Sequence, residues 1–280
     1  MGPVLVELAI GDAYGAGFEY ADADHVSRHN TLAAYVRNPV HPGLAPGRYT
    51  DDTQMALALA ELLVSGAPWT AVSIASAFTT AFHRDPREGY ARGFQGFLGS
   101  VRTGEEFLAR IRPDSDKSGA AMRVAPVGLL PDVADVLHHS DVQARVTHDT
   151  PDGLASARAA ALAVHYCHRG LGPVADVGAW VADRLGSPVW ATPWRGAVGA
   201  KGVMSARAAL TALATGGSLS AVLRACVAFT GDVDTVAAIA LAAASGSDEI
   251  AADLPASLVD GLEDGPFGRT HLSAVDALLP

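Results

Sequence analysis

Lysine, cysteine and long apolar runs are all scarce in this 280-residue chain. The only lysines are Lys117 and Lys201, and the net charge of −10 argues against a broad nucleic-acid surface, which needs clustered positive charge. Two cysteines cannot build a disulfide framework, and the first residues lack the basic region of a secretion signal. No uninterrupted apolar run approaches the roughly 20 residues of a membrane span. We therefore expect a cytoplasmic protein with no membrane association.

What the chain has in abundance is apolar sequence with helical character. Hydrophobic residues make up 49% of it, no linker or change of composition divides it, and strand signals are sparse. We expect an all-α fold, a compact multi-helix bundle forming a single domain over residues 1–280. The first helix should be short, over residues 4–10, and be ended by the glycines Gly11, Gly15 and Gly17. Further helices are predicted within 69–111 and at 131–147, 151–168, 204–215 and 219–229.

Two clusters of acids and threonines each precede an almost wholly apolar helix. The first is Thr50-Asp51-Asp52-Thr53, and the second contains Asp232, Asp234 and Thr235. The simplest interpretation of the first cluster is an N-cap, with the side chain of Thr50 or Asp51 accepting a bond from the first turn. Two acids beside two threonines go beyond what a cap requires.

Buried carboxylates need a positive partner, and neither cluster carries a lysine or arginine beyond Arg48. Asp51, Asp52, Asp232 and Asp234 would together balance two Mg²⁺ or Mn²⁺ ions, which prefer oxygen ligands. Thr50 and Thr235 could add hydroxyl oxygens. Because Asp232 and Asp234 would diverge within a regular helix, we place them in the loop or first turn before it.

These two motifs resemble the paired metal motifs of the ADP-ribosylglycohydrolase family, which includes the dinitrogenase-reductase-activating glycohydrolases. Three further segments are similar to the family's and occur in its order along nearly the whole chain. They are Gly11-Asp12-Ala13-Tyr14-Gly15 leading to Glu19, Ser118-Gly119-Ala120-Ala121-Met122-Arg123, and Thr147-His148. The resemblance implies an all-helical fold with a dinuclear metal site at its centre.

The resemblance also implies catalytic roles. Taken alone, Glu19 reads as a solvated loop acid, the commonest fate of glutamate. In the family the matching glutamate lies by the metals and helps position or activate the attacking water, so we expect Glu19, Asp51 or Asp234 to take its proton. Asp12 is interpreted as a structural turn or cap residue.

Substrate contacts are expected from several segments. The turn Lys117-Ser118-Gly119-Ala120, followed by Met122, leads into a helix whose free N–H groups would suit the diphosphate of ADP-ribose. Many family members have Gly-Asn where Lys117 and Ser118 stand, so Lys117 could supply a charge instead. Arg123 has two open interpretations, a buried structural pair or a ligand.

The remaining contacts have competing interpretations. Tyr90, Phe94 and Phe97 are either core residues or a stacking surface for adenine. His148 is either a structural group at a helix start or, by the resemblance, a contact for the adenosine or distal ribose. The irregular segment 186–202 has two open interpretations, a lid or an oligomer contact.

The resemblance implies a metal-dependent hydrolase that cleaves the glycosidic bond between ADP-ribose and a protein side chain, another acceptor or a small molecule. One alternative keeps the metals and acts on another ribosyl or nucleoside-type substrate. A second is a non-catalytic, crystallin-like scaffold, against which the retention of all four aspartates argues. The sequence indicates neither the acceptor nor the oligomeric state.

Overall fold

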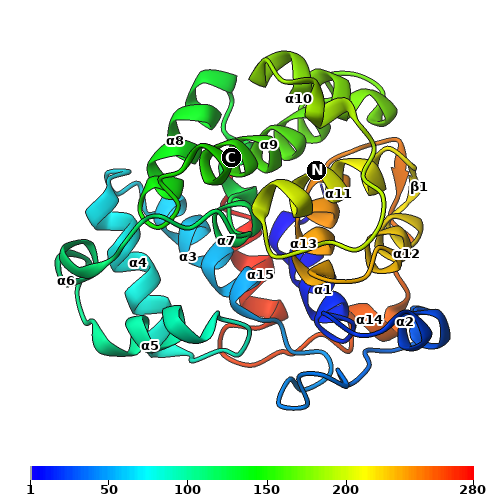
Figure 1. The fold of residues 1–280 in the computed structure, drawn as a ribbon, viewed down its shortest axis with the longest axis horizontal. Helices are drawn as coiled ribbons and strands as arrows, with labels where there is room; N and C mark the ends of the chain where they lie inside the picture. Colours follow the sequence, from blue (N-terminus) through cyan, green and yellow to red (C-terminus); the bar gives the residue numbers. More distant parts are fainter. Residues whose placement is uncertain (1) are drawn as a thin grey trace.

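The computed structural model describes residues 2–280 and shows an all-α single domain (Figure 1). This confirms the predicted fold class, while the domain limits at residues 1 and 280 stay a prediction. Strand structure in the described residues is confined to β1 (Gly217–Ser218) and β2 (Ile250–Ala251), which pair in parallel with Gly217 opposite Ile250. None of the described helices combines the length and apolar character that a bilayer span requires.

The helices follow one another along residues 2–280, and the two longest connections lie between α2 and α3 and between α10 and α11. Their bounds are α1 Val4–Ala16, α2 Ala23–His29, α3 Asp51–Ser65, α4 Ala71–Arg84, α5 Arg92–Ser100, α6 Gly104–Arg110, α7 Gly119–Met122, α8 Val133–Arg145, α9 Pro151–His168, α10 Val177–Leu185, α11 Gly202–Leu213, α12 Leu219–Ala228, α13 Val233–Ala244, α14 Ala256–Val259 and α15 Arg269–Asp276; the 3-10 helices are η1 Ala125–Leu129, η2 Val174–Asp176 and η3 Pro188–Ala191.

Helices α1 and α13 form the centre of the domain and lie side by side (Figure 1). Every residue of α13 is buried, as is every residue of α1 except Glu7. The prediction that the first helix ends at residue 10 was wrong, because α1 continues through Gly11 and Gly15 to Ala16 and has Gly17 as its C-cap. A Cβ at Gly11 would lie 2.6 Å from the carbonyl oxygen of Ala237, so these glycines allow the two backbones to approach closely.

The other helix predictions differ from the structure mainly at their ends. Helix α9 has the predicted bounds, 151–168, and α8, α11 and α12 lie within two residues of theirs. The helical pattern within 69–111 divides into α4, α5 and α6. Thr50 is the N-cap of α3, with its side chain accepting a hydrogen bond from the backbone N–H of Asp52, so the cap interpretation is confirmed.

Residues 186–202 form the predicted irregular connection and contain η3. Two backbone bridges tie its end to the rest of the domain, Val198 to Gly231 and Lys201 to Lys117. The segment therefore borders both the second acid motif and the predicted diphosphate turn. Its role as a lid or an oligomer contact stays a prediction.

Candidate functional site

The starts of α3 and α13 bring the two acid motifs together. Asp51 and Asp52 are the first two residues of α3, whereas Asp232 is the N-cap of α13 and Asp234 lies in its first turn, as predicted. All four side chains are buried. Gly231 precedes the second pair with φ +90°, a conformation that favours glycine, and this turn sets the direction of α13.

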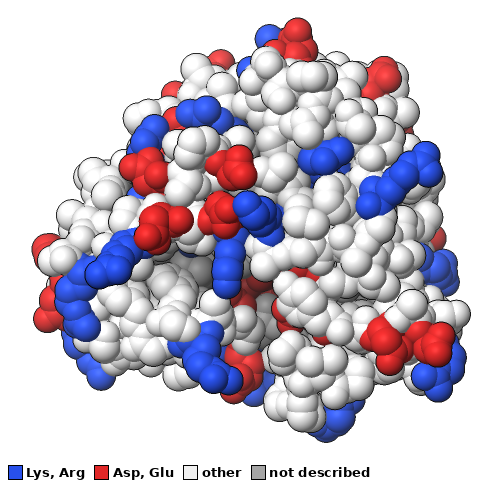
Figure 2. Space-filling view, viewed as in Figure 1, with Lys and Arg blue, Asp and Glu red and all other residues white. Residues whose placement is uncertain are grey.

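A third segment contributes Glu19, which follows the end of α1. Its carboxylate and those of Asp232 and Asp234 have oxygen atoms that all lie within 4.8 Å of one another. These three residues, with Asp51, Asp52 and Thr235, line a cavity of about 320 Å³. Figure 2 shows a hollow on one face of the molecule with acidic atoms in its depth and basic side chains beside it.

The carboxylates strongly disfavour one another's charge. Burial, and then the neighbouring acids, raise the pKa values of Asp51, Asp52 and Asp234 well above the ordinary value of an aspartate. The same two causes raise the pKa of Glu19 to about 8. Within residues 2–280, no lysine or arginine forms an ion pair with any of these groups, and Asp52 Oδ2 and Asp234 Oδ1 are buried with no hydrogen-bond partner. His41 Nε2 lies 3.9 Å from Glu19 Oε2, and the Ser205 hydroxyl donates to Asp232 Oδ2. An all-oxygen set of carboxylates without lysine or arginine partners fits hard divalent cations.

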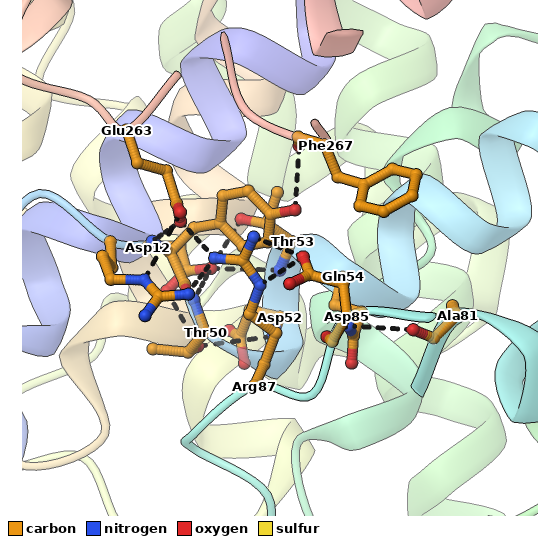
Figure 3. Close-up of polar contacts among 12 residues, drawn as sticks. Asp12, Thr50, Asp52, Thr53, Gln54, Ala81, Asp85, Arg87, Glu263 and Phe267 are labelled. Atoms are coloured by element: carbon orange, nitrogen blue, oxygen red, sulfur yellow. Dashed lines mark hydrogen bonds and ion pairs between the residues drawn. The ribbon is translucent and has the colours of Figure 1, made fainter. Parts of the chain in front are cut away.

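Asp12 anchors the start of α3 from inside α1 (Figure 3). Its carboxylate accepts from the N–H and hydroxyl of Thr50 at 2.9 and 2.8 Å and from those of Thr53 at 3.0 and 2.5 Å. Asp12 is therefore a cap residue, as predicted, although it stands in one helix and caps another. The Thr50 hydroxyl is engaged with Asp12, and Thr50 is not among the residues that line the cavity.

Arg87 holds the outer side of the same helix start through a buried ionic network that the sequence did not reveal. Its guanidinium pairs with Asp85 and Glu263, and stacks 3.7 Å from the centre of the Tyr49 ring (Figure 3). This fixes the loop that carries Gly89, where a Cβ would lie 2.8 Å from that of Thr50 and closer still to Asp51 Oδ1. Glycine is required there for the loop to pass Asp51.

Most residues predicted to contact the substrate do border the cavity: Phe94, Lys117, Ser118, Gly119, Met122 and His148. Tyr90 and Ala120 do not. The Tyr90 hydroxyl instead donates to Gln54 Oε1 at 2.7 Å, and Ala120 is fully buried. Phe97 packs edge-on against Phe107 at 4.9 Å, which is the core interpretation.

Comparison with known proteins identifies the family. A model of the ADP-ribosylglycohydrolase family matches residues 4–279. The chain belongs to the ADP-ribosylglycohydrolase family. The resemblance stated from the motifs is thereby confirmed. A solved structure described as an ADP-ribosylglycohydrolase-related protein complex superposes with a TM-score of 0.75 at 23% identity, over 99% of this chain and 95% of the other, and supports the fold.

The curated relatives match only part of this chain and part of their own length. ADP-ribosylhydrolase ARH3 from Bos taurus is 34% identical over 59% of this chain and 49% of its own length. ADP-ribosyl-[dinitrogen reductase] glycohydrolase from Rhodospirillum rubrum is 28% identical over 59% and 56%, and ADP-ribosylarginine hydrolase Tri1 from Serratia proteamaculans 26% identical over 59% and 46%. The chain thus spans about half the length of the curated relatives it matches.

In this member of the ADP-ribosylglycohydrolase family, two positively charged residues line the acidic cavity besides buried Arg123. Lys117 was anticipated, whereas Arg112 was missed, because it lies in a loop with no motif of its own. The helix after Lys117, α7, is a single turn of four residues, so the predicted diphosphate turn has little helix behind it. Arg123 is structural in its contacts, bonding Gln143 and Thr147 rather than a carboxylate.

Proposed function

We propose that this chain is a hydrolase that depends on divalent metal ions and cleaves the glycosidic bond between ADP-ribose and an acceptor. The observation that carries the proposal is a set of five carboxylates from three segments that faces one cavity, four of them buried and the fifth, Glu19, partly buried. A merely structural cluster would be paired with cations, since unpaired buried charge destabilises a fold. The relatives from Bos taurus and Rhodospirillum rubrum are named as hydrolases of ADP-ribosyl groups.

The metal site would be formed by Asp51, Asp52, Asp232 and Asp234, with oxygens of Thr50 and Thr235 completing it. The Thr50 hydroxyl donates its proton to Asp12, so a lone pair of its oxygen would serve a metal. Two Mg²⁺ or Mn²⁺ ions suit this charge. When bound, they would lower the pKa of a water molecule and orient ribose hydroxyls. The unpartnered oxygens of Asp52 and Asp234 are already available to them.

Glu19 is the group that accepts the proton of the attacking water in this proposal, with Asp51 or Asp234 as the other candidates. Its carboxylate borders the cavity and lies within 4.8 Å of those of Asp232 and Asp234. Glu19 also stands on a connection outside α1 rather than in a helix. A base in this place can reach a water held between the aspartates and the sugar.

The remaining wall of the cavity binds the rest of the substrate in this proposal. Phe94 and Met122 provide an apolar surface for a base, while Lys117 and Ser118 provide donors for a diphosphate. The cavity is therefore acidic where the ribose would react and apolar or basic elsewhere. That division suits a nucleotide sugar better than a small uncharged nucleoside, which needs no cation.

The test is release of free ADP-ribose from arginine-, serine- and DNA-linked ADP-ribose, with Mg²⁺, Mn²⁺ or EDTA. We expect release that requires metal and is abolished in the double variant Asp51→Asn Asp232→Asn. Asp135→Asn is the matched control, because it removes an exposed carboxylate on α8. Release in EDTA would contradict the metal role. No release from any substrate by a protein that binds metal would favour another ribosyl substrate or the scaffold role.

A further inference from the structure

A chain of hydrogen bonds in the wall of the cavity runs from Arg123 through Thr147 to His148. Arg123 is 1% exposed, and its Nη2 donates to Thr147 Oγ1 at 2.8 Å. Thr147 Oγ1 in turn lies 2.6 Å from His148 Nδ1. All three residues line the cavity, together with Gly119 and Lys117, and His148 ends the chain of hydrogen bonds.

The direction of each hydrogen bond follows from the protons available. Arginine can only donate, so it occupies one lone pair of the Thr147 hydroxyl. Among residues 2–280, Arg123 and His148 are the only hydrogen-bond partners of that hydroxyl, so its single proton has one acceptor, His148 Nδ1. The opposite arrangement, with Nδ1–H donating, would leave a buried hydroxyl proton unsatisfied. Nδ1 is therefore the acceptor, and the ring proton is on Nε2.

Nothing in the described part of the chain takes up the Nε2–H. No hydrogen bond joins Nε2 to any residue from 2 to 280, and the neighbouring backbone belongs to Gly119, where a Cβ would lie 3.2 Å from Nε2 and 2.9 Å from Cε1. Burial, and then the charge of Arg123, lower the pKa of His148 to about 3, while Asp116 acts in the opposite direction. The ring is thus neutral at working pH and carries one free N–H.

We propose that Arg123 and Thr147 are positioning residues that hold His148 as its Nε2–H tautomer, so that the cavity offers a neutral hydrogen-bond donor to an oxygen of a bound nucleoside diphosphate sugar. The identity of that ligand rests on the proposed function, whereas the tautomer does not. The assignment also means that Nε2 is not a metal ligand, because ligation requires its lone pair. His148 and the aspartates therefore serve different parts of the substrate.

The tautomer is measured directly in metal-free, substrate-free protein labelled with ¹⁵N-histidine, by long-range ¹H–¹⁵N spectra in which His148→Gln identifies the resonance. We expect Nδ1 to show the shift of an unprotonated nitrogen and Nε2 that of a protonated one. Thr147→Ser keeps the hydroxyl and the pattern, whereas Thr147→Val loses the single fixed tautomer. A protonated Nδ1 in the unaltered protein, or a pattern that is unchanged in Thr147→Val, would overturn the proposal.

The donor role is tested with free ADP-ribose and with the substrate that is turned over. We expect His148→Leu to raise KM about tenfold with little change in kcat, and His148→Gln, which keeps an N–H donor, to stay within a few fold. ADP-ribose should shift the Nε2 resonance in the unaltered protein. An equal rise in KM for both variants would overturn the donor role. The correct tautomer without any ADP-ribose binding would contradict the proposed function and the ligand named here, leaving the tautomer assignment intact.

Discussion

At the scale of single residues, two carboxylate oxygen atoms of the site have no hydrogen-bond partner among the described residues. Asp52 Oδ2 and Asp234 Oδ1 are buried, carry the charge of their carboxylates when ionised, and have no partner in residues 2–280. In most proteins such groups are hydrogen-bonded, because an unpartnered one destabilises the fold. The free energy lost by burying these two oxygens should be offset when a cation binds to them. The stability of the domain is thereby linked to its proposed cofactor.

Asp234→Asn should therefore have opposite effects with and without metal. In EDTA, loss of one repelled carboxylate should raise the free energy of unfolding by about 1–4 kcal/mol, because a buried unpaired charge is removed. In Mg²⁺ or Mn²⁺, the variant should lose the metal-dependent stabilisation of the parent and about 100-fold or more in activity. Chemical denaturation with each ion and with EDTA measures the first effect. A variant that is less stable than the parent in EDTA would contradict this account.

The role of a single residue could be predicted from the sequence where its neighbours in sequence set its position. The aspartates of both motifs could be predicted because each stands at the start of an apolar helix, where its position is set by neighbours in sequence. Tyr90 could not be assigned, because its hydroxyl is held by Gln54, 36 residues away. The partners Arg87 and Glu263 are 176 residues apart, and no periodicity relates them.

At the scale of elements, the contact of α1 with α13 depends on glycine. A Cβ at Gly15 would lie 2.8 Å from the backbone nitrogen of Asp234 and closer still to its Cα. Gly15→Ala should separate the helices, lower stability by about 2–3 kcal/mol as overpacking does, and reduce metal affinity. Gly93→Ala in α5 is the matched control, since a Cβ there meets nothing within 4 Å, and it should stabilise by about 0.5–1 kcal/mol. Equal effects of the two variants on thermal unfolding and metal titration would refute the close-packing argument.

The Arg87 network should stabilise the first acid motif as a unit. Arg87→Ala leaves Asp85 without its cationic partner, and leaves Glu263 with only the half-exposed Arg48 and the N–H of Tyr49. We expect a loss of about 3 kcal/mol. Arg87→Lys should recover less than half, because an ammonium cannot pair with both carboxylates and stack on Tyr49. Arg145→Ala, which breaks a pair whose side chains are both about half exposed, should cost less than about 1 kcal/mol. Urea denaturation of the three variants measures these losses. Full recovery of stability in Arg87→Lys would contradict the role of a guanidinium that pairs with two carboxylates at once.

Helix positions were largely predictable and helix ends were not. The bounds of α9 follow from Thr150 as its cap and Pro151 in its first turn, both local signals. The extension of α1 past Gly11 depends on the backbone of Ala237, which sequence alone does not place. The centre of the domain was thus the part for which local rules gave the wrong answer.

At the scale of the whole molecule, the chain's two ends meet in an acidic pair away from the cavity. Asp276 of α15 accepts from the N–H groups of Leu5 and Val6 at the start of α1, near Glu7. Burial and repulsion by Asp276 raise the pKa of Glu7 from 4.5 to about 7, and burial raises the pKa of Asp276 from 3.8 to about 6. The folded protein therefore holds these protons to higher pH than the unfolded chain does.

Stability should consequently fall as pH rises from about 4.5 to 7, because the folded state binds more protons than the unfolded state over that window. Glu7→Gln removes one of the two groups, and should raise stability by about 1–3 kcal/mol at pH 8 while leaving it nearly unchanged at pH 4. Denaturation in EDTA at both pH values measures the difference, and Glu105→Gln on the exposed start of α6 is the control. Parallel pH curves for the parent and Glu7→Gln would show that the pair does not titrate as described.

The pairing of α1 with α13 also has a consequence for biosynthesis. Helix α1 is apolar on nearly every side and leaves the ribosome before the other described helices, but the helix it packs against most extensively starts at Val233. At roughly 5–20 residues per second, α1 waits about 10–40 s for that partner. Throughout this interval the nascent chain exposes a hydrophobic segment. The yield of folded protein should therefore depend on chaperones that bind such segments and on the speed of translation.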